Sequence, residues 1–171
     1  MTSIIRAGEK DISLLADIGR LSFIESHGSS AAAEDIDEYV NNNYTYDAFI
    51  HELSNPEKIY HVIYYEDRPA GYSEIVFNDP HPDSKQKNVA KLNRLYMLKE
   101  FYSMKLGYEL FRFNVDLSKK NEQSGMWLYV WKENHRAVDF YEKAGFKIIG
   151  SHNFRISDKH SNPNHRMLLI F

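Results

Sequence analysis

Residues 134–146 carry the clearest structural signal of the chain and read Asn134-His135-Arg136-Ala137-Val138-Asp139-Phe140-Tyr141-Glu142-Lys143-Ala144-Gly145-Phe146. Four of their apolar or aromatic positions recur at helical spacing and would share one face of a short helix: Ala137, Phe140, Tyr141 and Ala144. Asn134 stands where a helix N-cap is expected, and Gly145 stands where a helix ends. The preceding residues, 126–131, are apolar and aromatic and predict a strand. The stretch is therefore predicted to be a strand followed by a capped helix.

A second strand and helix lie upstream of this stretch. Residues 89–98 read as a long strand, and the helix after it carries apolar residues at helical spacing, namely Leu106, Leu110, Phe113 and Leu117. The loop between them, 102–107, leads into a helix predicted from Tyr108 onward. The unpaired N–H groups at the start of a helix bind anions. The sequence therefore offers one local site for a phosphate.

Both stretches resemble the GNAT acetyltransferase superfamily. Residues 134–146 match every fixed position of its B motif, Asn-x-x-Ala-x-x-Phe-Tyr-x-Lys-x-Gly-Phe, and residues 92–97 with 100–107 are similar to its A motif. The resemblance covers nearly the whole chain and implies a single acetyltransferase domain over 1–171. The implied fold is α/β, of mixed α+β type, with a mostly antiparallel central sheet of about seven strands that splays in the middle and carries helices on both faces. The acidic helices near the start and the segment 150–154 look closest to PaiA-like bacterial polyamine (spermidine/spermine) acetyltransferases.

The other elements are predicted from local signals. Strands are expected at 3–6, 60–65, 71–77, 147–152 and 166–171. Asp11 is expected to cap a first helix that ends at the Gly-Ser-Ser break of 28–30, a second helix starts at about Glu34, and Thr45 caps a third helix that stops at Asn55-Pro56. Residues 79–84 and 158–165 are expected to be exposed polar loops.

The resemblance implies acetyl-CoA as cosubstrate, with its pantetheine arm paired like an extra strand with the main chain of Leu95 and Met97. The implied cofactor contacts are Leu95, Tyr96, Met97, Tyr102, Ser103, Met104, Lys105, Leu106, Gly107, Tyr108, Asn134, Tyr141 and Lys143. The loop departs from the family pattern Gln/Arg-x-x-Gly-x-Gly/Ala at two positions. Tyr102 replaces the Gln/Arg, and Lys105 replaces the first glycine, although lysine adopts positive φ poorly. Lys105 could instead place an ammonium near a phosphate.

The resemblance also implies two catalytic groups. Tyr141 would be the proton donor to the departing thiolate, since a phenol with a pKa of about 10 is protonated at neutral pH, and the Met97 amide would hold the oxyanion. From spacing alone Tyr141 is one more aromatic residue on a buried helix face. Asn134 reads as an ordinary N-cap and, by resemblance, also as a cofactor contact, and both roles are compatible.

The general base is left open by the sequence. Many relatives carry Glu in the strand before the loop, whereas this chain has Asn93, which accepts no proton. Glu74, Glu25 and His152 are the candidate bases and candidate acceptor contacts, together called the acceptor-side residues, although each is more often structural or on the surface. The alternative to a side-chain base is a water chain that carries the amine proton to bulk solvent. Such a chain suffices because even a small neutral fraction of the amine reacts when it is well oriented.

Composition excludes several classes of protein. The 171 residues include no cysteine, which excludes disulfides, a thiolate nucleophile and cysteine-bound zinc, and the net charge of −3 disfavours nucleic acid as a partner. No run is long and apolar enough for a membrane span, no export signal is visible, and the eight histidines show no metal-binding pattern, so a cytoplasmic protein is expected. Residues 21–57, the acidic arm, hold eight acids and no Lys or Arg. They form either a solvated helical face or a negative rim that attracts a cation.

The sequence therefore predicts an acetyl-CoA-dependent N-acetyltransferase that acts by direct attack in a ternary complex on a primary amine of a small cationic acceptor, with polyamines first. Within enzymes, the alternative is acetylation of a peptide or protein N-terminus, which needs an open groove. A catalytically impaired acyl-CoA-binding module and a pure scaffold are the non-enzymatic alternatives. A homodimer is plausible because edge strands of such sheets are often covered.

Overall fold

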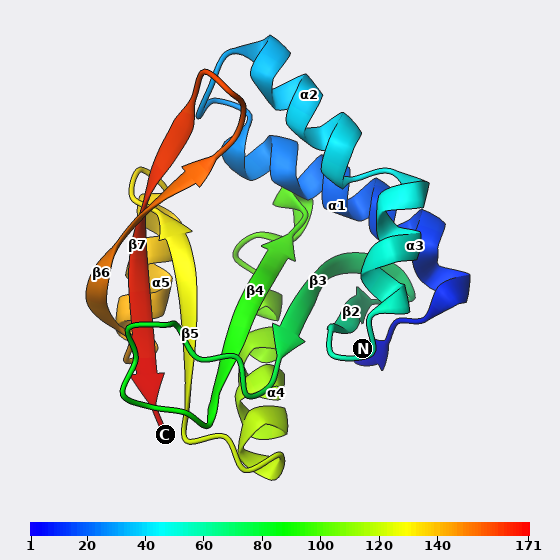
Figure 1. Ribbon diagram of the computed structural model, residues 1–171. Helices are drawn as coiled ribbons and strands as arrows, with labels where there is room; N and C mark the ends of the chain where they lie inside the picture. The colour runs from blue at the N-terminus through cyan, green and yellow to red at the C-terminus, as the bar shows by residue number, and fades with distance from the viewer.

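The computed structural model describes all 171 residues. Seven strands form one sheet in the order β1-β2-β3-β4-β5-β7-β6, in which every neighbouring pair is antiparallel except β4 and β5 (Figure 1). The strands are β1 (Thr2–Arg6), β2 (Ile59–Tyr65), β3 (Arg68–Val76), β4 (Val89–Met97), β5 (Gly125–Trp131), β6 (Lys147–Arg155) and β7 (Ser161–Ile170). The expected mostly antiparallel sheet is confirmed.

Helices cover both faces of this sheet. They are α1 (Ile12–His27), α2 (Ala33–Asn43), α3 (Tyr46–Ser54), α4 (Leu106–Lys120) and α5 (His135–Lys143), with short 3-10 turns at Glu9–Asp11 and Lys99–Phe101. Successive side chains of a strand point to opposite faces. Tyr60 of β2 accordingly packs against Phe49 of α3, with ring centroids 5.9 Å apart, whereas its neighbour His61 packs against Phe113 of α4 at 4.7 Å.

The two central strands separate along their length. β4 and β5 run parallel and pair only over Val89–Lys91 and Gly125–Trp127. Figure 1 shows them close at the lower edge of the sheet and diverging toward the upper edge, where α1 and the β6–β7 hairpin lie. The splay expected in the middle of the sheet is therefore present, and it leaves one edge of β4 without a partner strand.

Most helix ends follow the local signals. Thr45 Oγ1 accepts from the Ala48 amide at 3.1 Å, and Asn134 Oδ1 accepts from the Ala137 amide at 3.2 Å, so both predicted N-caps are confirmed. Gly145 follows α5 with a φ of 102°, the left-handed region that glycine favours. Asp11 is an exception, because its carboxylate accepts from the Gly8 amide rather than from α1. α4 begins at Leu106, earlier than the predicted Tyr108.

The expected polar loop over 158–165 is wrong from Ser161 onward. β7 begins there, so His165 lies in a strand, and its partner β6 continues past the expected end at His152 to Arg155. The reason is an alternation among polar residues that hydrophobic periodicity does not reveal. Asn162 and Asn164 are 1% and 7% exposed, whereas the intervening Pro163 is exposed.

Candidate active site

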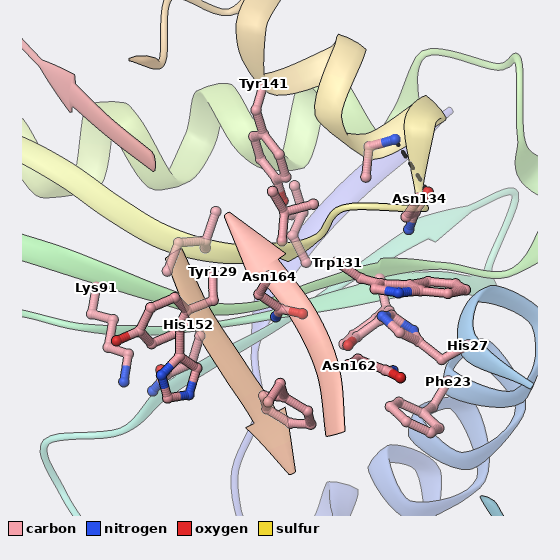
Figure 2. A pocket seen from close by; sticks show the side chains of 17 residues that line it. Phe23, His27, Lys91, Tyr129, Trp131, Asn134, Tyr141, His152, Asn162 and Asn164 are labelled. Carbon is pink, nitrogen blue, oxygen red and sulfur yellow. Dashed lines mark hydrogen bonds between the residues drawn. The ribbon is translucent and has the colours of Figure 1, made fainter. Parts of the chain in front are cut away.

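The splay between β4 and β5 opens onto a cavity of about 290 Å³, called here the acceptor cavity. It is lined by Phe23, His27, Lys91, Leu92, Asn93, Leu95, Tyr96, Tyr129, Val130, Trp131, Asn134, Ala137, Tyr141, His152, Phe154, Asn162 and Asn164. Figure 2 shows side chains entering it from α1, α5 and the strands β5, β6 and β7. No Asp or Glu belongs to this lining.

The free edge of β4 presents main-chain donors toward the splay. Leu98, just after β4, donates its amide to the Ala70 carbonyl of β3 at 2.9 Å, and Tyr96 is paired with Tyr72. Because amides alternate in direction along a strand, those of Leu95 and Met97 face away from β3, toward the side that β5 has left. These are the two main-chain positions that the sequence assigned to a pantetheine arm.

A second hollow of about 490 Å³, called here the cofactor cavity, lies where β4 gives way to α4. It is lined by Met97, Phe101, Tyr102, Ser103, Lys105, Leu106, Gly107, Tyr108, Arg136, Phe140, Lys143 and Ala144. Its charged side chains are Lys105, Arg136 and Lys143, all cationic. The structure thus brings most of the predicted cofactor residues together, while Met104 is exposed and lines neither cavity.

The loop before α4 is held in a left-handed backbone conformation. Ser103 and Lys105 have φ values of 71° and 61°. Lys105 therefore adopts the conformation that glycine favours at this position, which the sequence alone made doubtful. Gly107 lies against β4, and a Cβ there would be 3.3 Å from Met97 Cγ. The loop, the start of a long helix and three cations suit a pyrophosphate group.

Tyr141 and Asn134 project from α5 into the acceptor cavity, as Figure 2 shows. Tyr141 is 8% exposed, and its ring packs against Phe140 and Phe146. Burial raises the pKa of the Tyr141 phenol well above its ordinary value. Tyr141 is consequently protonated at neutral pH.

Only one of the three predicted acceptor-side residues lines the cavity. His152 does so, with its ring stacked on Tyr129 at 4.3 Å. Glu25 instead accepts the Lys99 amide at 2.7 Å, which ties the end of α1 to the turn after β4. The acids of α2, at 34, 35, 37 and 38, do not line the cavity either.

Glu74 is 2% exposed and belongs to a buried hydrogen-bond network. Its carboxylate accepts from the Tyr60 hydroxyl at 2.9 Å and from Asn93 Nδ2 at 3.0 Å, and it lies 3.3 Å from Arg94 Nε. The Arg94 guanidinium in turn lies over the ring of Tyr44, 5.2 Å from its centroid. Asn93, which also lines the acceptor cavity, thus connects this network to the cavity.

Four residues that the sequence analysis did not select shape the acceptor cavity. His27 and Phe23 come from α1, and Asn162 and Asn164 come from β7. Asn162 donates to Ser30 Oγ at 2.8 Å, which joins the β6–β7 hairpin to the loop after α1. The one signal for α1 is helical spacing, since Phe23 and His27 are four positions apart. In the cofactor cavity the overlooked residue is Arg136, whose guanidinium lies 3.5 Å from the centroid of Tyr102.

Two further findings concern metal binding and membrane spans. No three His, Cys, Asp or Glu side chains are grouped so that they could hold a metal ion. No helix is both long and apolar enough to cross a bilayer.

Known proteins share this fold and sequence pattern. An uncharacterised N-acetyltransferase from Lactobacillus delbrueckii subsp. lactis is 26% identical over 155 residues, which cover 91% of this chain and 90% of that protein. The crystal structure of the PaiA N-acetyltransferase from Thermoplasma acidophilum in complex with coenzyme A superposes with a TM-score of 0.79 at 20% identity, covering 100% and 99% of the chains. The ribosomal-protein-S18-alanine N-acetyltransferase from Escherichia coli superposes with a TM-score of 0.72 at 15% identity, covering 99% and 94%.

The match to a family model is the more specific result. The model of the acetyltransferase (GNAT) family matches residues 27–146, which include the β4–α4 loop and the whole 134–146 stretch that contains α5. The chain therefore belongs to the GNAT family and is an acetyl-CoA-dependent N-acetyltransferase.

Proposed function

We propose that residues 1–171, as one domain, transfer the acetyl group of acetyl-CoA directly to a primary amine of a small acceptor. The observation that carries this proposal is the position of the two cavities on either side of one strand end and one helix. On β4, Leu95 and Tyr96 line the acceptor cavity, whereas Met97 lines the cofactor cavity. On α5, Tyr141 lines the acceptor cavity and its neighbour Phe140 lines the cofactor cavity. A thioester that follows the end of β4 would therefore meet an amine from the other side.

Cofactor binding is assigned to the cofactor cavity and the open edge of β4. The amides at the start of α4, with Lys105, Arg136 and Lys143, would neutralise the pyrophosphate. The pantetheine amides would pair with the main chain of Leu95 and Met97 as an added strand does. Asn134 would contribute its free NH₂ group, since its oxygen is engaged in capping α5.

Two groups of the chain then act on the reacting atoms. The acceptor nitrogen bonds to the carbonyl carbon and loses one N–H proton toward solvent, and the Met97 N–H stabilises the negative charge on the carbonyl oxygen. When the carbon–sulfur bond breaks, the sulfur takes the Tyr141 hydroxyl proton, and the tyrosine is reprotonated from solvent. No acyl-cysteine intermediate is available, because the chain contains no cysteine.

The identity of the acceptor is the finer part of the proposal. Polyamines were placed first because of the acidic arm, and they would have to bind the exposed acids of α2, because no carboxylate lines the cavity. The peptide or protein N-terminus gains support from the aromatic lining, which holds no carboxylate that would attract a polycation. A cytoplasmic location and a homodimer stay predictions from the sequence.

Thiol release from acetyl-CoA with a panel of amines tests the proposal, alongside calorimetric titration of CoA. We expect CoA to bind and at least one primary amine to be acetylated. Binding without turnover on any amine would favour an acyl-CoA-binding module, and a failure to bind CoA would favour a scaffold. Changing Glu34, Asp35, Asp37 and Glu38 to amides should raise the KM for spermidine alone if polyamines are acceptors.

A further inference from the structure

His27, the last residue of α1, places an imidazole in the wall of the acceptor cavity. Its ring stacks on Phe23 with centroids 4.9 Å apart and an angle of 6°, and it lies 5.6 Å from Trp131 of β5. The ring of Tyr96 from β4 meets it edge-on, with centroids 5.9 Å apart. Figure 2 shows the ring between Phe23 and Trp131 on the wall formed by α1. Contacts from two strands and its own helix therefore hold the orientation of this ring.

Hydrogen bonding leaves one ring nitrogen free. Nδ1 lies 2.7 Å from the Ser26 hydroxyl oxygen, and that hydroxyl also lies 2.8 Å from the Ser22 carbonyl one helical turn back. A serine in a helix donates its proton to such a carbonyl. Ser26 Oγ then accepts from Nδ1–H, and the lone pair of the ring is on Nε2, which has no partner within the protein.

The surroundings keep this imidazole neutral. Burial lowers the pKa of His27 to about 4. The titratable groups nearest to the ring are Tyr96 of β4 and, beyond Phe23, Tyr39 of α2, and burial raises the pKa of both phenols. On its own helix, Glu25 is engaged by the Lys99 amide. Lys91 and His152, from β4 and β6, line the same cavity.

A second polar group without a partner faces the same space. Asn164 is 7% exposed, its side chain makes no hydrogen bond, and its Oδ1 is fully buried. Figure 2 shows Asn164 on β7 across the cavity from His27 and Trp131. A buried amide without a partner costs about 1–3 kcal/mol. Because Oδ1 is closed off from solvent, a ligand would gain affinity by accepting a hydrogen bond from Nδ2.

Given the transferase function proposed above, we infer that His27 Nε2 accepts a proton from the attacking amine, and that the acceptor is a weakly basic α-amine next to a carbonyl, as in an amino-acid amide or a peptide N-terminus. The amine enters uncharged, because the cavity offers an ammonium no carboxylate. As its nitrogen bonds to the carbonyl carbon it becomes positive and acidic, and one N–H proton passes to Nε2. Asn164 Nδ2 donates to the neighbouring carbonyl of the acceptor.

A pair of amines with similar bodies tests the acceptor class. Phenylalaninamide carries an α-amine next to a carbonyl, with a pKa of about 8, whereas 2-phenylethylamine and spermidine have the basicity of lysine, with a pKa of about 10. From the neutral fractions, kcat/KM at pH 7.5 should favour phenylalaninamide about 100-fold, and this ratio should fall to about fourfold at pH 9.5. A higher kcat/KM for spermidine at pH 7.5 would overturn the acceptor class.

Substitution of His27 tests the proton acceptor. His27→Phe keeps the stacking and should lower kcat/KM for phenylalaninamide about 100-fold with the KM for acetyl-CoA unchanged. His51→Phe, the same change at an exposed site on α3, is the matched control and should be silent. Ser26→Ala frees the Nδ1 proton and should give a smaller loss, which covers the case of a poorly folded His27→Phe.

The outcomes separate this inference from the proposed function. If amines are acetylated but His27→Phe and Ser26→Ala keep the full kcat/KM, the role of His27 is refuted and the transferase function stands. If the acid limb of kcat/KM for phenylalaninamide follows an enzyme group instead of the amine's own pKa, the uncharged entry of the acceptor is refuted. If no amine releases CoA, the proposed function fails and this inference fails with it.

Discussion

The two cavities of this protein differ in how the chain builds them. The cofactor cavity is made from two short segments, 97–108 and 136–144, each of which is nearly continuous in sequence. The acceptor cavity takes residues from α1, β4, β5, α5, β6 and β7, between Phe23 and Asn164. One therefore depends on local backbone conformation and the other on long-range packing.

The charges of the two cavities differ in the same way. Lys105, Arg136 and Lys143 make the cofactor cavity cationic, which suits a phosphate ligand. The acceptor cavity is aromatic and amide-lined, with Lys91 as its one permanently charged side chain. Under the proposed function, acetyl-CoA, which is the same ligand throughout the family, would bind to a local sequence motif. The acceptor would bind to a surface whose residues come from the whole chain and can vary independently.

The largest effect is expected at Tyr141, which lines the acceptor cavity beside the end of β4. Tyr141→Phe removes the proposed proton donor and should lower kcat by about 10²–10⁴-fold while the KM for acetyl-CoA stays the same. The measurement is steady-state thiol release. Tyr46→Phe, on an exposed tyrosine of α3, is the matched control. A kcat within twofold of the parent protein would assign Tyr141 to packing alone.

The next largest effect is expected on the free energy of unfolding, at the buried pair of Glu74 and Arg94. Glu74→Gln removes the carboxylate that faces Arg94, and breaking a buried pair costs about 3–5 kcal/mol. The exposed pair of Arg68 and Glu100 gives a matched control, because Glu100→Gln should cost less than about 1 kcal/mol. Urea unfolding measures both. Equal losses would show that the network around Glu74 contributes no more than a surface ion pair.

The sequence predicts the motif-built cavity well for a physical reason. Asn134 and Gly145 set the ends of α5 through interactions within a few residues, so their structural roles can be predicted from the local sequence alone. The backbone conformation of the loop before α4 was harder to predict, because Lys105 adopts a positive φ that its side chain does not favour. Arg136 was overlooked because helical spacing places it beside the apolar face of α5 but does not show that its guanidinium lies over the ring of Tyr102.

The acceptor cavity could not be predicted in this way. Asn162 and Asn164 lie in a polar stretch that reads as a loop, and they are buried only because β7 pairs with β5 on one side and β6 on the other. Glu74 was a candidate base until its register with β4 placed it against Arg94. His27 is an ordinary helix-end histidine until β5 brings Trp131 to it. Each of these features depends on a contact between residues far apart in the sequence, which local patterns do not reveal.

Two N-caps allow a finer comparison between the site and the rest of the molecule. Asn134→Ala and Thr45→Ala each remove one capping hydrogen bond and should each cost about 1 kcal/mol in urea unfolding. Only Asn134→Ala should also raise the KM for acetyl-CoA, because the free NH₂ group of Asn134 is the proposed cofactor contact. Asn134→Ser should restore stability but not the KM. A normal KM in Asn134→Ala would limit this residue to capping.

The smallest effect is expected at Lys105, where charge and backbone conformation oppose each other. Lys105→Gly relieves a left-handed lysine but adds chain entropy to the unfolded state, so the free energy of unfolding should change by less than about 1 kcal/mol. Loss of one cation from the cofactor cavity should raise the KM for acetyl-CoA by about fivefold at low salt. Lys105→Asn, which also tolerates positive φ, should raise it equally, and the difference from the parent protein should shrink as salt screens the charge. A lower KM in Lys105→Gly would mean instead that close approach of the backbone to the phosphate matters more than the ammonium at this position.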